Sequence, residues 1–312
     1  MSGTRNRPRR AARVLASLVL AAILLLAPSF PAGEAPGGKV VRRLGVVSLY
    51  NPRLMYLKLQ PLADWLSEAT GEHWELALAT SYEQAVDDLC GGGIDLAYLG
   101  PFTYVIAHER CGAEPLVHLR TGEKDTFESW ILVREESGIR DLAGLRGHRI
   151  AFGSPLSTSS YLVPRAMLER AGLRLGADVT CAFYGHHERA ARAVLLGEAD
   201  AAGVRDTIGA RFVGRGLRLL VRSDPIPNFP FVVPRGTPPE LRRRWRHVLV
   251  DLPARDPRAR EAMASWDVEL RDGFAPADDR FYDPVRAVVR EVFGRLRPGD
   301  GYPLPPCARG RP

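Results

Sequence analysis

Residues 93–104 read Gly-Ile-Asp-Leu-Ala-Tyr-Leu-Gly-Pro-Phe-Thr-Tyr and contain a strand, a turn and the start of a helix. The run Ile94–Leu99 is short and apolar, which is typical of a buried strand. Gly100-Pro101 predicts a turn that opens a helix reaching His108, because proline is favoured in the first helical turn. A buried strand followed at once by a helix predicts a βαβ unit.

The same alternation continues on both sides of this stretch. Apolar strand patterns occur at 40–47 and 74–79 towards the N-terminus, and at 149–152, 179–183 and 200–204 towards the C-terminus. Each is followed by a helical pattern, which favours mostly parallel sheets flanked by helices. The sequence therefore predicts an α/β protein.

A polar break at Glu135–Gly138 indicates a passage from one lobe to another. We assign residues 39–134 and 223–297 to a first lobe and residues 135–222 to a second, interpreting the helical segments after Val233 as a return. The chain then crosses twice between the lobes, which is the architecture of a two-segment hinge that closes on a ligand. Residues 298–312 are rich in proline, glycine and arginine, and we expect a flexible tail there.

The N-terminal residues have the pattern of an export signal. Five arginines precede the uncharged apolar run Val14–Ala27, and Pro28, Pro31 and small residues follow. Residues 1–32 are therefore predicted to be a signal peptide, which makes the protein periplasmic or otherwise extracytoplasmic. The apolar run is short for a membrane span, but an uncleaved anchor stays open as the alternative.

The basic composition depends partly on this signal. The whole chain has 43 Lys and Arg against 36 Asp and Glu, and five of the basic residues but none of the acidic ones lie in residues 1–32. The remaining 38 basic and 36 acidic residues leave a net charge of only +2. No basic run with interleaved aromatic residues is present either, so we expect no nucleic-acid partner.

Four cysteines suit an oxidising compartment. Cys90 and Cys111 each end a predicted helix beside a glycine in the first lobe, so they either form a disulfide or remain buried thiols. The sequence does not decide the pairing of Cys181 and Cys307. The spacing of the cysteines matches no metal site.

Hydroxyl residues gather where strands end and helices begin, at 80–82, 100–104 and 157–160. Ligands of open α/β sheets bind at this edge, where helix N-termini present unpaired N–H groups. One Ser or Thr is enough to cap a helix, yet Ser157-Thr158-Ser159-Ser160 offers four. Ser157, Thr158 and Ser159, with backbone N–H groups, can surround the oxygens of a tetrahedral oxyanion.

Other polar residues at this edge have two interpretations each. Tyr82 either contacts the ligand or only packs. His187 lies in His186-His187-Glu188, which lacks further metal ligands at a supporting spacing, so it either donates a hydrogen bond to an anion or starts an exposed helix. Arg205 and Asp206 either lie on the ligand side of the sheet or form a surface ion pair.

The order of these motifs resembles the periplasmic phosphate/phosphite/phosphonate-binding proteins of ABC transporters, a branch of the type II periplasmic binding fold. The resemblance covers most of residues 42–235. It is carried by Pro61-Leu62-Ala63 with Thr70-Gly71, Ser81-Tyr82-Glu83, residues 93–101 with Tyr104, Ser137-Gly138-Ile139 with residues 141–147, Phe152 with Ser157-Thr158-Ser159, and His187-Glu188 before residues 197–202.

The resemblance implies a small phosphorus oxyanion, a phosphonate, phosphite or phosphate, held between the two lobes. It implies that Ser157, Thr158 and Ser159 form the main cradle, that Tyr82 reaches over from the other lobe, and that His187 donates a hydrogen bond. It also implies an ABC permease in the inner membrane as partner. We expect a monomer without a metal or other cofactor.

Two positions depart from the family pattern. Phe127 stands where the family commonly has a tyrosine, so a hydroxyl is missing. Arg205 and Phe229 stand where aminophosphonate binders place acids, with Asp206 one position away. Because a buried ammonium group facing Arg205 is costly, we expect this chain to disfavour amino-bearing ligands and to favour a simple or carboxylated dianion.

Two other functions are compatible with this fold. A sensor that passes its closed form to a membrane receptor or kinase would use the same fold, and the sequence does not separate it from a transport protein. An enzyme acting on a small phosphonate would need an activated nucleophile. Ser159 and His187 lack an evident orienting acid, so we expect no catalysis.

Overall fold

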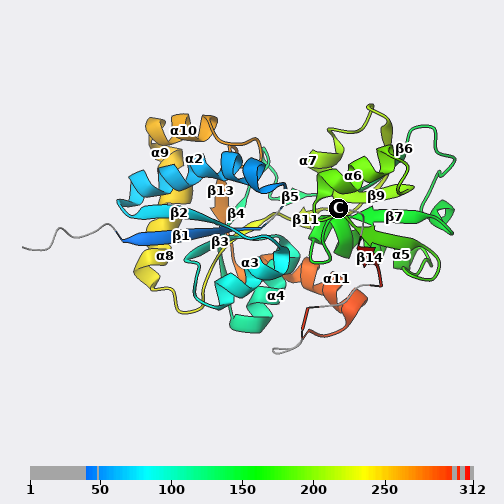
Figure 1. Cartoon of the computed structure of the whole chain (residues 1–312). Helices are drawn as coiled ribbons and strands as arrows, with labels where there is room; N and C mark the ends of the chain where they lie inside the picture. The colour runs from blue at the N-terminus through cyan, green and yellow to red at the C-terminus, as the bar shows by residue number, and fades with distance from the viewer. Residues whose placement is uncertain (1–39, 48, 297–300, 303–305, 310–312) are drawn as a thin grey trace, which may run out of the picture. The chain divides into compact units, whose positions relative to one another are not determined.

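The computed structural model describes residues 40–47, 49–296, 301–302 and 306–309 (Figure 1). The predicted signal peptide, residues 1–32, lies outside the described residues. From Val40 onwards the chain belongs to one compact unit. Within the described ranges, none of the helices combines the length and the apolar character needed to cross a bilayer.

The first lobe is built on a six-stranded sheet with the order β13-β4-β12-β3-β1-β2. Its strands are β1 Val41–Val46, β2 His73–Leu78, β3 Leu96–Tyr98, β4 Glu114–Leu119, β12 Pro230–Val233 and β13 Phe274–Pro276. Strand β1 is parallel to both β2 and β3, whereas β12 is antiparallel to β3 and β4. The helices that accompany this sheet are α2 Pro52–Thr70, α3 Tyr82–Cys90, α4 Pro101–Cys111, α8 Pro239–Arg246, η3 His247–Asp251, α9 Leu252–Arg255 and α10 Pro257–Ala264.

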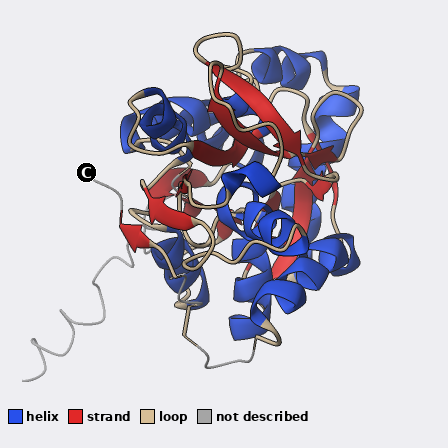
Figure 2. Ribbon diagram, turned by 90° about the vertical axis from the view of Figure 1, so that its right-hand side faces the viewer, coloured by secondary structure: helices blue, strands red, loops and turns tan. Residues whose placement is uncertain are grey.

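The second lobe is built on another six-stranded sheet, with the order β10-β6-β9-β7-β8-β14. Its strands are β6 Ser129–Arg134, β7 Arg149–Phe152, β8 Thr180–Phe183, β9 Ala201–Arg205, β10 Leu217–Arg222 and β14 Ala308–Arg309. The helical segments between them are η1 Ala143–Leu145, η2 Thr158–Leu162, α5 Val163–Arg170, α6 His187–Leu195 and α7 Asp206–Gly209. Figure 2 shows strands flanked by helices, so the predicted α/β class is confirmed.

Two short strands join the lobes. Strand β5, Thr126–Phe127, pairs antiparallel with β11, Ile226–Pro227. The sequence placed the first passage at Glu135, but β6 pairs with β9 and β10 of the second sheet, so the chain has crossed before Ser129. The polar break after Arg134 is the turn that follows β6. The sequence located this turn correctly but could not show to which sheet the preceding strand belongs.

The C-terminal tail also differs from the expectation. Cys307 forms a disulfide with Cys181, and Ala308–Arg309 pair in parallel with β8. These described residues of the tail are therefore fixed to the second lobe rather than free. Two backbone pairs and one disulfide leave no compositional signature, which explains why proline and glycine content alone predicted flexibility. Cys90 and Cys111, the pair considered from the sequence, are also joined by a disulfide.

Helix α2 illustrates how local sequence sets these elements. The Asn51 side chain accepts a hydrogen bond from the N–H of Leu54 at 3.0 Å, and Pro52 occupies the first turn. Both features favour a helix start at this point. The helix ends at Gly71, whose φ of 70° is in the left-handed region that glycine adopts without strain. Pro61 lies inside the helix without ending it.

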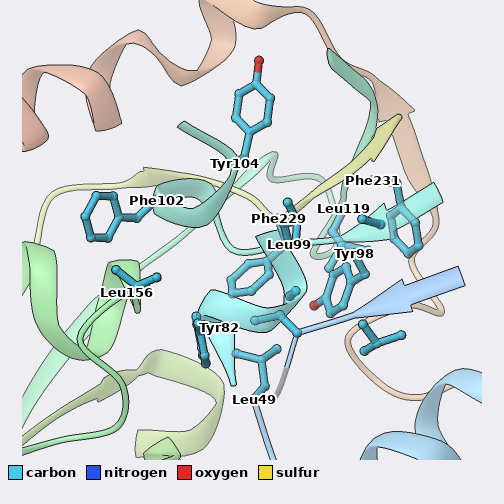
Figure 3. Packing of buried hydrophobic residues seen from close by; sticks show 14 of the residues in the cluster. Leu49, Tyr82, Tyr98, Leu99, Phe102, Tyr104, Leu119, Leu156, Phe229 and Phe231 are labelled. Atoms are coloured by element: carbon cyan, nitrogen blue, oxygen red, sulfur yellow. The ribbon is translucent and has the colours of Figure 1, made fainter. Parts of the chain in front are cut away.

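Aromatic side chains fill the core around strand β3. The ring of Tyr98 lies 5.4 Å from that of Phe229 and 5.1 Å from that of Phe231, measured between centroids. Figure 3 shows these rings beside one another, with Tyr82 and Leu156 nearby. Leu156 precedes the serine-rich loop of the second lobe, yet it belongs to the same buried cluster as residues of the first. Apolar packing therefore continues from one lobe to the other.

Strand β9 approaches the serine-rich loop so closely that a side chain at Gly203 would not fit. A Cβ atom there would lie 2.7 Å from the carbonyl oxygen of Ser160 and 2.9 Å from Cγ of Pro164. Gly203→Ala should therefore lower the free energy of unfolding by about 1–3 kcal/mol, as overpacking does elsewhere. Urea denaturation measures the change. Gly138→Ala is the control, because a Cβ there meets no atom within 4 Å; equal losses in both variants would contradict this explanation.

Candidate functional site

The serine-rich loop follows strand β7 and opens helix η2. The loop contains Ser157, Thr158, Ser159 and Ser160, all of which are buried. Ser157 caps η2, since its Oγ accepts the N–H of Ser160 at 3.1 Å. Pro164 lacks the N–H that would bond the carbonyl of Ser159, and the hydroxyl of Ser129 donates to that carbonyl instead, at 2.6 Å. The loop is thus held by side chains of its own lobe.

Ser160 and Thr158 have structural partners. The Ser160 hydroxyl donates to the carbonyl of Gly203 and accepts the N–H of Gly153, both at 2.6 Å. Thr158 Oγ1 accepts the N–H of Phe102 at 2.8 Å. That N–H is one of the unpaired groups at the start of α4, where Gly100 offers no side-chain cap. Thr158 therefore caps a helix of the opposite lobe, and because its hydroxyl only accepts in this bond, its own proton is available to a further acceptor such as the predicted ligand.

His187 is buried beside Ser157 and is neutral. Its Nδ1 accepts the backbone N–H of Arg205 at 3.0 Å, so the ring proton is on Nε2, which lies 3.0 Å from Ser157 Oγ and donates to it. Burial, and next the charge of Arg205, lowers the pKa of His187 to about 3. Because Ser157 Oγ already accepts two hydrogen bonds, its own proton is available to a further acceptor.

Three other hydroxyl groups at this place are buried and unpartnered. Ser159 Oγ, Tyr82 OH and Tyr98 OH have no hydrogen-bond partner among the described residues. The Tyr82 hydroxyl faces Ser157 from the other lobe, and the Tyr98 hydroxyl faces Arg205. Burial raises the pKa of both tyrosines, so both stay protonated. Buried polar groups are normally satisfied, and unsatisfied ones at a lobe junction indicate a binding site.

Arg205 is the charged centre of the site. Its side chain is 1% exposed, and its guanidinium carbon lies 4.7 Å from the ring centroid of Phe127 and 4.6 Å from that of Phe229. Phe127 thus supplies a ring face to the guanidinium and no hydroxyl. Nη2 donates to Asn228 Oδ1 at 3.3 Å, while Nε and Nη1 make no hydrogen bond within the described chain.

The counter-ion of Arg205 is Glu269, which the sequence analysis missed. Glu269 Oε2 lies 3.5 Å from Arg205 Nη1, and Oε1 accepts hydrogen bonds from Tyr50 at 2.7 Å and Thr207 at 3.2 Å. Burial opposes ionisation, but Arg205 and these hydrogen bonds lower the pKa of Glu269 overall. Glu269 belongs to the first lobe and Arg205 to the second, so the pair links the lobes.

Asp206 lies at the start of α7, beside Arg205 but with other main partners. Its Oδ1 accepts the N–H of Thr207 at 2.7 Å and its Oδ2 accepts the N–H of Glu128 at 3.1 Å. Arg205 Nε lies 3.8 Å from Asp206 Oδ1. Burial raises the pKa of Asp206 despite these contacts. The main hydrogen-bond partners of the Asp206 carboxylate are therefore backbone N–H groups near the hinge.

The structure thus brings most of the predicted residues together. His187 contacts both Ser157 and the backbone of Arg205, the Tyr82 hydroxyl of the first lobe faces Ser157, and Phe127 of the hinge covers Arg205. Residues that the sequence analysis did not assign to the site are Glu269, Tyr98, Tyr50 and Asn228. No local pattern marks them, because each reaches the site through strand pairing or lobe packing. In the described ranges no three His, Cys, Asp or Glu side chains gather as metal ligands.

Cavity size does not locate this site. A groove of about 390 Å³ lies elsewhere, between α5, residues 222–227 and the C-terminal helix α11, Asp283–Phe293. Beside Tyr50, Tyr98 and Glu269 there is a space of only about 10 Å³, roughly enough for one water molecule. The buried donors, rather than the volume, therefore define the candidate site.

A family model and a characterised relative both match this chain over most of its length. The family model described as "ABC transporter, phosphonate, periplasmic substrate-binding protein" matches residues 44–282. The phosphate-import protein PhnD of Mycolicibacterium smegmatis is 28% identical over 269 residues, which cover 78% of this chain and 84% of that protein. The matched region includes both sheets up to β13 and all the residues of the site described above.

Solved structures show the same fold. PhnD1 from Prochlorococcus marinus, in complex with methylphosphonate, superposes with a TM-score of 0.72 at 17% identity, covering 82% of this chain and 99% of that one. A binding-protein component of an ABC phosphonate transporter from Pseudomonas aeruginosa gives a TM-score of 0.70 at 19% identity, covering 80% and 86%. The predicted two-lobed type II fold is confirmed.

One prediction from this site concerns the buried ion pair. Glu269→Gln removes the buried carboxylate of this pair and leaves Arg205 with Asp206 alone, 3.8 Å from Nε, so it should lower the free energy of unfolding by about 3–5 kcal/mol. Adding Arg205→Met to this variant should restore part of the loss, because no unpaired charge remains. Urea denaturation measures both. The control is Glu291→Gln, which breaks an exposed pair with Arg170 and should cost less than about 1 kcal/mol. Equal costs for the two Glu→Gln variants would refute the role of burial.

Another prediction from this site concerns the pH dependence of stability. The pKa of His187 is lower in the folded protein, about 3, than in the unfolded chain, about 6.5. Between these values the unfolded state binds more protons, so stability present above pH 6.5 is lost as the pH falls, by up to about 1.4 kcal/mol per unit. Unfolding free energies of His187→Gln should show a shallower decline over this window. The exposed His247→Gln variant should follow the wild type; a His187→Gln profile parallel to wild type would contradict the assignment.

Proposed function

Since the chain belongs to the periplasmic substrate-binding proteins of ABC phosphonate transporters, we propose that its two lobes bind a phosphonate, phosphite or phosphate oxyanion at Ser157, Ser159 and Tyr82. The family consists of transport proteins, which act outside the cytoplasm, rather than enzymes. The relative from Mycolicibacterium smegmatis is described as importing phosphate, and PhnD1 from Prochlorococcus marinus was solved with methylphosphonate.

The observation that carries this proposal is the set of buried donors without protein acceptors. Ser159 Oγ and Tyr82 OH come from opposite lobes and have no partner in the described chain, and Ser157 has a proton to donate. An acceptor-rich tetrahedral anion satisfies all three at once. His187 acts by fixing the orientation of Ser157, and Thr158 acts by joining the lobes.

The chemistry of the acids bears on ligand specificity. Glu269 balances the charge of Arg205, so repulsion by Arg205 alone is smaller than the sequence indicated. However, Asp206 and Glu269 both accept two hydrogen bonds from protein donors, and Glu269 is also paired with Arg205, so a ligand ammonium group would have to compete with these partners. We therefore keep the expectation that amino-bearing phosphonates bind more weakly than phosphite, phosphate or methylphosphonate.

Catalysis is disfavoured by the tautomer of His187. A histidine that activates a serine must accept the serine proton on Nε2. Here Nε2 carries a proton, because Nδ1 accepts a backbone N–H, and Nδ1 has no carboxylate partner. Ser157 is therefore not activated. We propose that the protein acts as a monomer, exported by residues 1–32, that delivers its ligand to an ABC permease and does not bind nucleic acid.

The test is a binding series with phosphite, phosphate, methylphosphonate, 2-aminoethylphosphonate and sulfate. A ligand at 100 times its dissociation constant should stabilise the protein by about 2.7 kcal/mol, which a thermal-shift assay detects. Ser159→Ala should weaken binding about 10- to 100-fold, since a hydrogen bond to a charged group contributes about 1.5–3 kcal/mol. Calorimetry measures the affinities.

The matched control is Ser265→Ala, on the surface of the first lobe, which should leave the affinity unchanged. The specificity proposal fails if 2-aminoethylphosphonate binds more tightly than the other ligands. The binding proposal itself fails if none of the phosphorus oxyanions shifts the melting temperature, or if Ser159→Ala binds them as the wild type does.

A further inference from the structure

The C-terminal residues connect the two lobes a third time. On the second lobe, Cys307 is bonded to Cys181 of β8, and β14 extends the sheet beside it. Pro306 packs against Gly176, where a Cβ atom would lie 3.1 Å from Cβ of the proline. This anchor is covalent, so it persists as long as the disulfide is oxidised.

The second anchor is Tyr302, on the first lobe. Its hydroxyl lies 2.9 Å from the carbonyl oxygen of Glu83 and 2.8 Å from Asp87 Oδ1, both in helix α3. Arg110 of α4 donates to the same hydroxyl at 2.7 Å, and its guanidinium carbon lies 5.5 Å from the centroid of the tyrosine ring. Glu83 directly follows Tyr82, so this anchor lies next to the proposed ligand contact.

The distance that the chain can span between these anchors is short. Tyr302 and Cys307 are five residues apart in the sequence. A fully extended chain covers at most about 3.5 Å per residue, so their Cα atoms cannot separate by more than roughly 18 Å. A movement that carries α3 and β8 further apart than this is possible only if the contacts of Tyr302 break or if a reductant has opened the Cys181–Cys307 disulfide.

Helix α11 leads the chain into this junction. Phe293, at its end, stacks on Phe102 of the first lobe with ring centroids 5.8 Å apart. The guanidinium carbon of Arg165, from the second lobe, lies 4.9 Å from the centroid of the same ring. Glu291 pairs with Arg170 of the second lobe through two hydrogen bonds of 2.6 and 2.7 Å. The helix is therefore already in contact with both lobes before the tail begins.

From these contacts we propose that Tyr302 and residues 306–309 form a C-terminal strap that limits how far the lobes open. The hinge strands β5 and β11 allow the lobes to rotate, and the strap sets the end point of that rotation. A limited opening keeps the ligand-free protein close to its closed form, which lowers the cost of closure on ligand binding. The effect on ligand release rests on the function proposed above, whereas the limit on opening does not.

The strap is tested with two disulfide variants. Cys181→Ser/Cys307→Ser releases the strap, while Cys90→Ser/Cys111→Ser removes a disulfide that lies entirely within the first lobe. Small-angle X-ray scattering of the ligand-free proteins should give a larger radius of gyration for the strap variant only. Stopped-flow measurements should show methylphosphonate dissociating several-fold faster from the strap variant only.

A reductant provides an internal check on folding. The chain has four cysteines, so in Cys90→Ser/Cys111→Ser the strap disulfide is the one that remains. Adding dithiothreitol to this variant should reproduce the larger radius, and Tyr302→Phe, which leaves the disulfide intact, should do so in part. The strap proposal is refuted if Cys181→Ser/Cys307→Ser has the same radius of gyration as the wild type, or if the two disulfide variants show equal increases in this radius. If methylphosphonate binds to none of the proteins, the proposed ligand fails while the scattering still decides the strap.

Discussion

The charged side chain of Arg205 is only 1% exposed, and its Nη1 lies 3.5 Å from Oε2 of the oppositely charged Glu269. Neither residue would be stable there alone, because an unpaired buried charge is strongly unfavourable. Phe127 and Phe229, whose ring centroids are 5.3 Å apart, both pack against the guanidinium, and Tyr50 and Thr207 donate hydrogen bonds to Glu269. Since the two charges come from different lobes, the arrangement exists only when the lobes meet.

The hydroxyl groups of the serine-rich loop depend on the same junction. The backbone N–H of Arg205 donates a hydrogen bond to Nδ1 of His187, so the ring proton lies on Nε2 and is donated to Ser157 Oγ. The hydroxyl proton of Ser157 is therefore not used in the bond to His187. Thr158 caps α4 across the junction, and Ser160 ties the loop to β9. Of the four consecutive hydroxyls, Ser160 donates its proton to a carbonyl, Ser157 and Thr158 accept hydrogen bonds and keep their own protons, and Ser159 Oγ has no partner in the described chain. A run of four therefore exceeds ordinary capping for a physical reason.

The sequence predicted the α/β class and the two-lobed fold because apolar periodicity and helix caps are local features, as at Gly100-Pro101 and Asn51. It also indicated the serine-rich loop, since hydroxyls at a strand end are visible in one short stretch. The role of Glu269 could not be predicted, because its partner, Arg205, is distant in the sequence and the two residues meet only through the packing of the lobes. Likewise, composition does not reveal that β6 pairs with β9 and β10 of the second sheet, or that Cys307 is bonded to Cys181, because these partners are remote in the sequence.

A crystal structure of the protein with methylphosphonate will show directly whether donors from both lobes hold a phosphorus oxyanion. Phosphonate oxygens should lie at about 3 Å, hydrogen-bonding distance, from Ser157 Oγ, Ser159 Oγ and Tyr82 OH, with the Arg205–Glu269 pair intact. A phosphonate found instead against Arg170 and Arg222 in the groove beside α11, with the Ser159 and Tyr82 hydroxyls still unpartnered, would contradict this mode of binding.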